Sequence, residues 1–398
     1  MELVVSQGQD LALPHRPGLA LPHRKGSRVN LRTLGPWFAI LACVCLFSWL
    51  SEGSFLSPRN LSNLSRQICV NLTLAVGMTF VILTSGIDLS VGSLLALTGM
   101  VAAISQAHWG FAGLGAAGAV YSFVLAVGLG GLMGSVTGFG ISRLRITPFI
   151  ISLGMMVICR GLTLIISQAQ AVAPLGDSLG ALSSDYLSVQ ASGALLIGVL
   201  IWVVGVWVNR YARGRVLITD LVSKLPLWVV GLAAAAYVFC GYRGIPYMVF
   251  CSCTVACAGI WVLGFTRFGR FAYAIGGNRE AAELSGIPVA RTLFAVYVVM
   301  GCLAGLAGVL DAARVNGAVP SAGELAELDA IAAVVIGGTS LMGGAGSVTG
   351  TLLGVLIMGV LNNGMSLVGI SEHFQKVFKG VVIILAVYMD ARSKRQQG

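Results

Sequence analysis

The sequence predicts an all-α fold, a polytopic transmembrane helical bundle with about 10–12 membrane segments, one of which is a candidate for a re-entrant or broken helix. Of the 398 residues, 57% are hydrophobic and only 10% are charged, whereas soluble domains carry about 25% charged residues. Apolar runs near bilayer length recur along the chain. The ten-residue alternation of a membrane β-barrel is absent, and helices satisfy their backbone polar groups within each span.

Twelve apolar segments are expected to form the bundle. They cover residues 34–50, 68–86, 89–107, 112–137, 148–168, 193–208, 225–240, 246–265, 292–311, 329–341, 347–368 and 376–389. The segment 329–341 is short for a full crossing and is the candidate for a re-entrant or broken helix. The glycine-rich run Gly128–Gly134 supplies small residues for close helix packing. No clear internal repeat is visible.

The charge distribution predicts an orientation. Most of the 25 Lys and Arg residues lie in the N-terminal tail, in the loops after every second span and at the C-terminus. The positive-inside rule therefore predicts that both termini are cytoplasmic. Residues 1–33 are expected as a disordered basic tail, 34–391 as the transmembrane domain and 392–398 as a cytoplasmic tail. The net charge of +10 is explained by these loops, so no nucleic-acid partner is expected.

The sequence offers no catalytic site. It has no Gly-x-x-x-x-Gly-Lys-[Ser/Thr] phosphate loop, and its four histidines are far apart. Cys251, Cys253 and Cys257 lie close together, but no His or carboxylate accompanies them at a zinc spacing. Neither a metal nor a cofactor is expected. If transport is active, its energy comes from a partner subunit or from an ion gradient.

The predicted cytoplasmic loop 266–291 contains the signals of a short helix. Asn278 can cap it, and the residues from Glu280 to Leu284 are good helix formers. Gly286 ends it, and Pro288 follows two residues later. Such a helix, lying across the cytoplasmic face, is suited to docking another subunit. A plain connecting loop is the alternative.

Polar residues within or beside apolar segments are candidates for a translocation path or a gate. They are Asn71, Asp88, Ser90, Arg160, Asn362 and Asn363. Polar groups inside a membrane are costly and often face a pathway. The competing interpretation is structural, with Asp88 as a cap or ion-pair partner, Ser90 as the cap of the next helix and the asparagines as interhelical hydrogen bonds.

Several strings in this order resemble the permease subunits of bacterial sugar ABC importers of the ribose, xylose, arabinose and galactose group. The resemblance runs from about residue 35 to about residue 395. Its strongest pieces are Gly86–Ser93, Thr147–Ile150, Gly276–Gly286, Glu327–Ala333, Gly337–Gly344 and Asn362–Met365. An additional apolar stretch around residues 190–240 favours the xylose-type members.

The resemblance implies how such a chain works. The loop around Gly276–Gly286 looks like the Glu-Ala-Ala coupling loop, which docks on an ATP-binding subunit where ATP is hydrolysed. The residues assigned to this coupling are Gly277, Asn278, Arg279, Glu280, Ala281, Ala282, Ser285 and Gly286. Further partners implied are a second permease copy, a periplasmic sugar-binding protein and membrane lipid.

The substrate implied is D-xylose or a related pentose. Ribose, arabinose, galactose or a polyol are alternatives within the same family. A more distant alternative is a proton-coupled secondary transporter that uses Asp88 and needs no partner subunit.

Overall fold

The computed structural model describes residues 31–212 and 218–395. Most of the predicted N-terminal tail, and residues 396–398 of the predicted C-terminal tail, lie outside the described residues. Residues up to Gly35 form a unit of their own, of which only the first turn of α1 is described, and the account below concerns Pro36–Arg395.

Within these ranges the secondary structure consists of helices, and no strand occurs among the described residues. The helices are α1 (Leu31–Leu50), η1 (Ser54–Leu56), α2 (Pro58–Leu83), α3 (Val91–Ala107), η2 (Phe111–Leu114), α4 (Ala116–Ser142), α5 (Pro148–Ser167), α6 (Asp177–Ser184), α7 (Val189–Ala212), α8 (Ile218–Cys240), α9 (Tyr247–Phe265), α10 (Arg267–Gly277), α11 (Arg279–Leu284), α12 (Val289–Val315), α13 (Ala326–Ile336), α14 (Val348–Leu367) and α15 (Glu372–Arg395).

The prediction of an all-α polytopic bundle is confirmed. Every predicted apolar segment coincides with a helix of the structure. Seven of the described helices, namely α2, α4, α5, α7, α9, α12 and α14, are long and apolar enough to cross a membrane, and shorter apolar helices cover Trp37–Leu50, Val91–Ala107 and Val229–Cys240.

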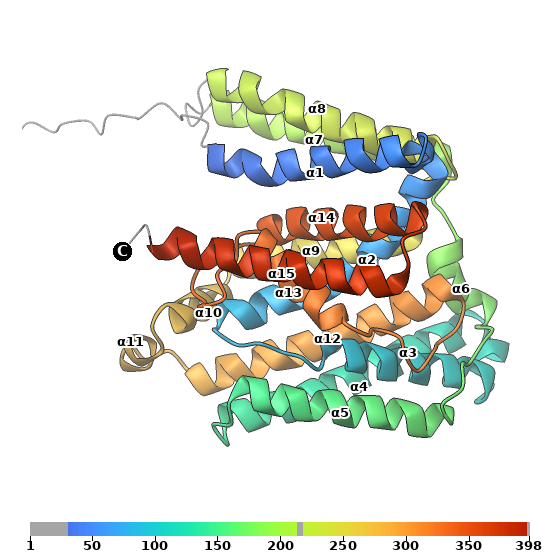
Figure 1. Cartoon of the computed structure of the whole chain (residues 1–398), viewed down its shortest axis with the longest axis vertical. Coiled ribbons are helices and arrows are strands. Elements are labelled where there is room, and N and C mark those ends of the chain that lie inside the picture. Colours follow the sequence, from blue (N-terminus) through green and yellow to red (C-terminus); the bar gives the residue numbers. More distant parts are fainter. Residues whose placement is uncertain (1–30, 213–217, 396–398) are drawn as a thin grey trace, which may run out of the picture. The chain divides into compact units, whose positions relative to one another are not determined.

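Helix α12 forms the centre of the packing, because it contacts α2, α3 and α4 along its length (Figure 1). Its contact with α4 brings backbone against backbone. A Cβ added at Gly130 or Gly134 of α4 would collide with the backbone of Gly301 on α12. The close packing predicted for the Gly128–Gly134 run is thus present, and α12 is its partner.

The helices α2–α5 and the helices α12–α15 form two groups with the same internal arrangement but opposite direction. In the first group α3 packs on α4 and α5, and in the second group α13 packs on α14 and α15. Between the groups, α3 and α4 pack on α12, and their counterparts α13 and α14 pack on α2. Gly86, just beyond the end of α2, lies against Tyr297 near the start of α12, so the two helices are antiparallel. This inverted repeat was missed in the sequence, which shows no clear repeat of residues.

Each group contains one broken span. Helix α13 has 11 residues, a length of about 16 Å, against a hydrocarbon core of about 30 Å. The irregular segment 316–325 precedes it, as the irregular segment 84–90 precedes α3. The start of α3 touches the irregular segment 316–325, because a Cβ at Gly92 would collide with the Gly323 carbonyl. Residues 329–336 of the predicted segment 329–341 are helical, and a re-entrant or broken course of this segment in the membrane stays a prediction. Helix α3 is the counterpart of α13 in the other group.

We call the end of α12 that joins α11 the α11 end, and the opposite end, where α6 packs near Asn316, the α6 end. Helices α2 and α4 finish at the α11 end, whereas α5 starts there with Pro148. The loop 337–347 also lies there, since the Gly344 N–H donates to the Leu83 carbonyl at 3.0 Å.

The crossing of α13 and α14 gives a test of this packing. A Cβ at Gly354 would overlap the Ala333 carbonyl, whereas nothing lies within 4 Å of a Cβ at Gly154 on α5. We expect Gly354→Leu to lower the free energy of unfolding by about 1–3 kcal/mol or more, measured as the thermal midpoint in detergent. The matched variant Gly154→Leu is expected to leave the midpoint unchanged, and equal shifts in both variants would contradict the packing.

Candidate functional site

The short helix α11 is closed at both ends by its own residues. The Asn278 Oδ1 accepts the N–H of Ala281 at 2.9 Å, which caps the start. At the other end Gly286 has φ +77°, its N–H donates to the Glu283 carbonyl at 3.0 Å, and the Ile287 N–H donates to the Ala282 carbonyl at 3.1 Å. This pair of bonds is a Schellman motif. The helix predicted between Asn278 and Gly286 is confirmed.

One side of α11 is anchored and the other is open. Ala282 is 4% exposed, whereas Leu284 is 91% exposed, more than any other large apolar side chain among the described residues. Glu280 is also exposed, and Arg279 pairs with Glu283 at 3.6 Å across one turn. The helix therefore presents an apolar tip surrounded by charges on a backbone that its caps hold in place.

A second helix, α10, precedes α11 and was not predicted. Residues 266–277 were expected to be part of a loop, and the structure corrects this. The Thr266 Oγ1 accepts the N–H of Gly269 at 3.3 Å and caps the helix, while Ala272 and Ile275 are buried on one face. The apolar spacing within a glycine- and arginine-rich stretch was the signal that sequence reasoning overlooked.

Hydrogen bonds connect the α10–α11 unit to the two helix groups. The Ser85 hydroxyl, just after α2, donates to the Met342 carbonyl at 2.7 Å and lies 3.3 Å from the Gly276 carbonyl. A Cβ at Gly276 would collide with the Leu83 carbonyl, so these backbones touch. Through these contacts, a displacement of α11 would be transmitted to the end of α2 and to the loop between α13 and α14.

Tyr273 makes a further link from α10 to the same loop. Its hydroxyl donates to the Gly346 carbonyl at 2.8 Å. Partial burial raises the pKa of the Tyr273 phenol above its ordinary value, so the hydroxyl keeps its proton and remains a donor at neutral pH.

A polar pocket of about 220 Å³ lies toward the α6 end, between α2, α12, α14 and α15. Two of the predicted path residues, Asn71 and Asn362, lie in its wall. The lining comprises Gln67, Val70, Asn71, Asp311, Arg314, Gly359, Asn362, Ser366, Gln375 and Lys379.

Two ion pairs stabilise the neighbourhood of this pocket. Lys379 Nζ lies 2.8 Å from Asp329 Oδ2, and Asn362 donates to the same oxygen at 3.3 Å. Arg314 pairs with Asp311 at 2.8 Å. The second carboxylate oxygen of Asp329 and the amide oxygen of Asn362 are buried without a hydrogen-bond partner. Asp329 and Lys379 were missed as site residues, although a charge inside an apolar segment was the available signal.

Three other predicted path residues make local or interhelical contacts. Asn363 exchanges side-chain hydrogen bonds with Asn60 of α2 at 2.9 and 3.2 Å. Asp88 Oδ1 accepts the backbone N–H of Ser90 at 2.9 Å and its hydroxyl at 2.6 Å. Ser90 does stand at the start of α3, but the expected side-chain cap is absent because its hydroxyl donates to Asp88.

Arg160 lies within α5, as predicted, and contacts the second broken span. Its guanidinium Nη1 donates to the Pro320 carbonyl and to the Ala322 carbonyl, the latter at 3.0 Å. These carbonyls belong to the irregular segment before α13, so Arg160 supplies hydrogen bonds that a helix would otherwise provide.

The chain is thus a polytopic helical bundle with a capped, exposed short helix at one end. Residues 60–387 match the family described as the branched-chain amino acid transport system / permease component, and the chain belongs to this family.

Its curated relatives include sugar permeases. The chain is 38% identical over 376 residues to the xylose transport system permease protein XylH of Escherichia coli K12, covering 92% of this chain and 94% of the relative. It is 37% identical over 375 residues to XylH of Haemophilus influenzae, covering 92% and 98%. It is 39% identical over 356 residues to the ribose import permease protein RbsC of Escherichia coli K12, covering 89% and 92%.

These relatives confirm the resemblance to sugar importer permeases that the sequence motifs indicated. No solved structure matches the chain.

The ion pair between α13 and α15 can be tested by a double-mutant cycle. Removing one partner of a largely buried pair leaves the other charge uncompensated, so Asp329→Asn and Lys379→Met should each cost about 3 kcal/mol of stability. We expect the double variant to recover part of that loss. Thermal or denaturant unfolding in detergent measures the stability of the unchanged protein and of the three variants. Strictly additive losses of stability would show that the two charges do not interact.

Proposed function

We propose that the chain is the membrane permease of an ATP-driven importer of a pentose, with D-xylose the first candidate and ribose the second. The relatives named for xylose and ribose support this choice, but their similar identities do not separate the two sugars. The hairpin of α7 and α8, which occupies the additional stretch around residues 190–240, favours the xylose type. Arabinose, galactose and polyols are the alternatives.

The capped helix α11 with its exposed Leu284 is the observation that carries the proposal. A helix fixed by its own caps transmits force without bending, and its exposed Leu284 can enter an apolar pocket on another protein. We assign this role to the coupling residues Gly277, Asn278, Arg279, Glu280, Ala281, Ala282, Ser285 and Gly286. The partner is an ATP-binding subunit, and ATP hydrolysis takes place there.

The orientation follows from the distribution of charges. The α11 end carries Arg143 directly after α4, and Arg267, Arg279 and Arg291 in the first turns of α10, α11 and α12. By the positive-inside rule, these cations place the α11 end in the cytoplasm. The α6 end then faces the periplasm, where a sugar-binding protein delivers the substrate. Both termini are cytoplasmic, and the membrane is the bacterial inner membrane.

Transport proceeds by alternating access. Sugar enters the polar pocket from the periplasmic side, where Asn71 and Asn362 offer amide groups to its hydroxyls and the free oxygen of Asp329 lies nearby. Closure of the ATP-binding subunits moves α11, and the contacts of α10 with Ser85 and Gly346 carry the motion to α2 and α14. A second permease copy packs on the exposed apolar faces of α5 and α15.

The coupling role is tested at the tip of α11. In proteoliposomes that contain the ATP-binding subunit and the sugar-binding protein, Leu284→Asp should reduce both stimulated ATP hydrolysis and sugar uptake by about tenfold or more, as expected for a central interface residue. The matched variant Leu284→Met keeps the apolar tip and should retain both activities. Full uptake by Leu284→Asp would exclude the docking role.

The path is tested at the polar pocket. Asn362→Leu removes the amide and narrows the pocket, so uptake should fall while assembly with the ATP-binding subunit persists. Thr254→Leu, on an exposed part of α9, serves as the control and should transport normally. Unchanged uptake by Asn362→Leu would exclude this path. Accumulation of sugar by the permease alone, driven by a pH gradient, would favour the secondary transporter.

A further inference from the structure

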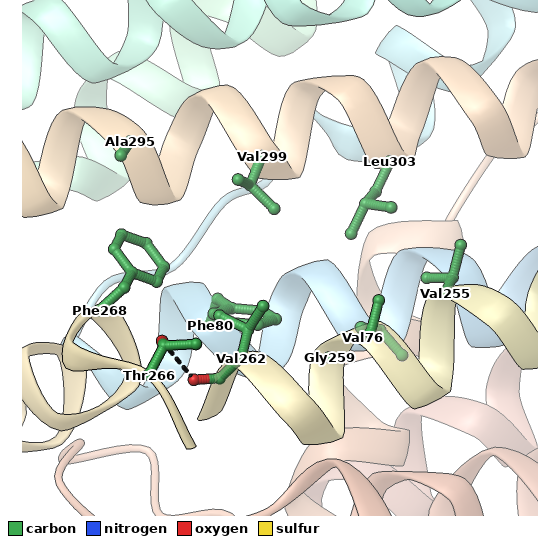
Figure 2. Close-up of a pocket in the computed structure, with 11 residues that line it drawn as sticks. Val76, Phe80, Val255, Gly259, Val262, Thr266, Phe268, Ala295, Val299 and Leu303 are labelled. Atoms are coloured by element: carbon green, nitrogen blue, oxygen red, sulfur yellow. Dashed lines mark hydrogen bonds between the residues drawn. The ribbon is translucent and has the colours of Figure 1, made fainter. Parts of the chain in front are cut away.

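An apolar groove of about 520 Å³ runs between α12 on one side and α2 and α9 on the other (Figure 2). Figure 2 shows Val299 and Leu303 of α12 directed toward the α2 and α9 wall, with Phe268 of α10 at one end. Its lining is Val76, Phe80, Val255, Ala258, Gly259, Val262, Thr266, Phe268, Ala295, Val299 and Leu303. Such a lining offers a sugar almost nothing to bind.

The groove extends over the depth of one lipid leaflet. Its wall on α12 runs from Ala295 to Leu303 and its wall on α9 from Val255 to Val262, with Thr266 one turn further on. These helical distances amount to about 12–16 Å, which matches half of the bilayer core of about 30 Å. Thr266 and Phe268 place one end of the groove at the α11 end of the bundle.

Two exposed arginines flank that end. Arg291 precedes Ala295 by one turn, so it continues the stripe of Ala295, Val299 and Leu303 on α12. Arg267 lies in sequence between Thr266 and Phe268, both of which line the groove. Within the part of the chain that the structure describes, neither arginine belongs to an ion pair. The groove is thus an apolar channel with positive charge at its end.

We propose that this groove binds one acyl chain of an anionic phospholipid, with the phosphate group at Arg267 and Arg291. The depth of one leaflet, the apolar walls and the cationic end each match a part of such a lipid. A helix of a second copy is the other occupant that an apolar groove can take, and the experiment below distinguishes it from a lipid. The proposal is independent of which sugar is transported.

The bound chain would also support the docking helix. Phe268 belongs to the first turn of α10, and the Phe80 ring lies tilted against it with ring centroids 6.1 Å apart. A lipid chain between α9 and α12 would fill the space beneath these rings. The lipid would then hold α10, and through it α11, in the position that the contacts with α2 require.

The experiment measures lipid bound to the purified permease in complex with its partner subunits by native mass spectrometry, after exchange into nanodiscs of phosphatidylglycerol mixed with phosphatidylcholine. Val299→Phe fills the groove and should abolish the retained phospholipid. The pair Arg267→Gln with Arg291→Gln should lower the preference for phosphatidylglycerol by about 25-fold, since one arginine contributes about 1 kcal/mol near an anionic surface, or about fivefold.

Two matched controls carry the same changes elsewhere. Val124→Phe adds the same ring on the exposed face of α4, and Arg243→Gln removes a cation outside the groove. Both should retain the lipid as the unchanged protein does. If Val299→Phe lowers the thermal midpoint, Ala258→Phe fills the groove from the opposite wall.

Three results would overturn the proposal. The first is undiminished lipid in a folded groove-filling variant, and the second is a preference for phosphatidylglycerol that survives loss of both arginines. The third is disulfide formation between two copies that carry Val299→Cys, which would make a second permease chain the occupant.

Discussion

The structure depends on the rule that backbone polar groups cannot meet lipid unpaired. The chain breaks its helical spans twice, at 84–90 and at 316–325, and both breaks lie within the packed bundle. Arg160 donates to carbonyls of the second break, and Asp88 accepts the Ser90 N–H in the first. The charged side chains inside the bundle thus supply hydrogen bonds to the irregular backbone.

This constraint explains why the six polar residues expected in a path do not form one site. Asp88, Ser90 and Arg160 stabilise the broken backbone, and Asn363 pairs with Asn60, whereas Asn71 and Asn362 line a pocket. Intramembrane polarity therefore serves two purposes in this chain. The position of a polar residue in the sequence does not show which of the two purposes it serves. Only the structure shows whether its side chain contacts irregular backbone, another helix or a pocket.

The sequence was sufficient where the governing interactions are local. The Asn278 cap and the Gly286 turn of α11 lie within nine residues, and the apolar spans follow from hydropathy alone. Helix α10 was missed because Gly269, Gly276 and Gly277 indicate a loop when the burial of Ala272 and Ile275 is not known. The Lys379–Asp329 and Asn60–Asn363 pairs join residues 50 and 303 positions apart. No local pattern specifies such partners, and the inverted repeat is likewise carried by packing rather than by residue identity.

Helices α2 and α12 each contribute to both cavities. On α2, Asn71 lines the polar pocket and Val76, little more than one turn later, lines the apolar groove. On α12, Asp311 lines the polar pocket and Leu303 lines the apolar groove. A rotation or tilt of this antiparallel pair therefore changes the two cavities together. Since Ser85 joins the end of α2 to α10 and α10 leads into α11, the docking helix, the groove and the pocket are connected through one pair of helices. Occupation of the groove would thus bias the pair toward one arrangement, in proportion to the difference in lipid affinity between the two arrangements.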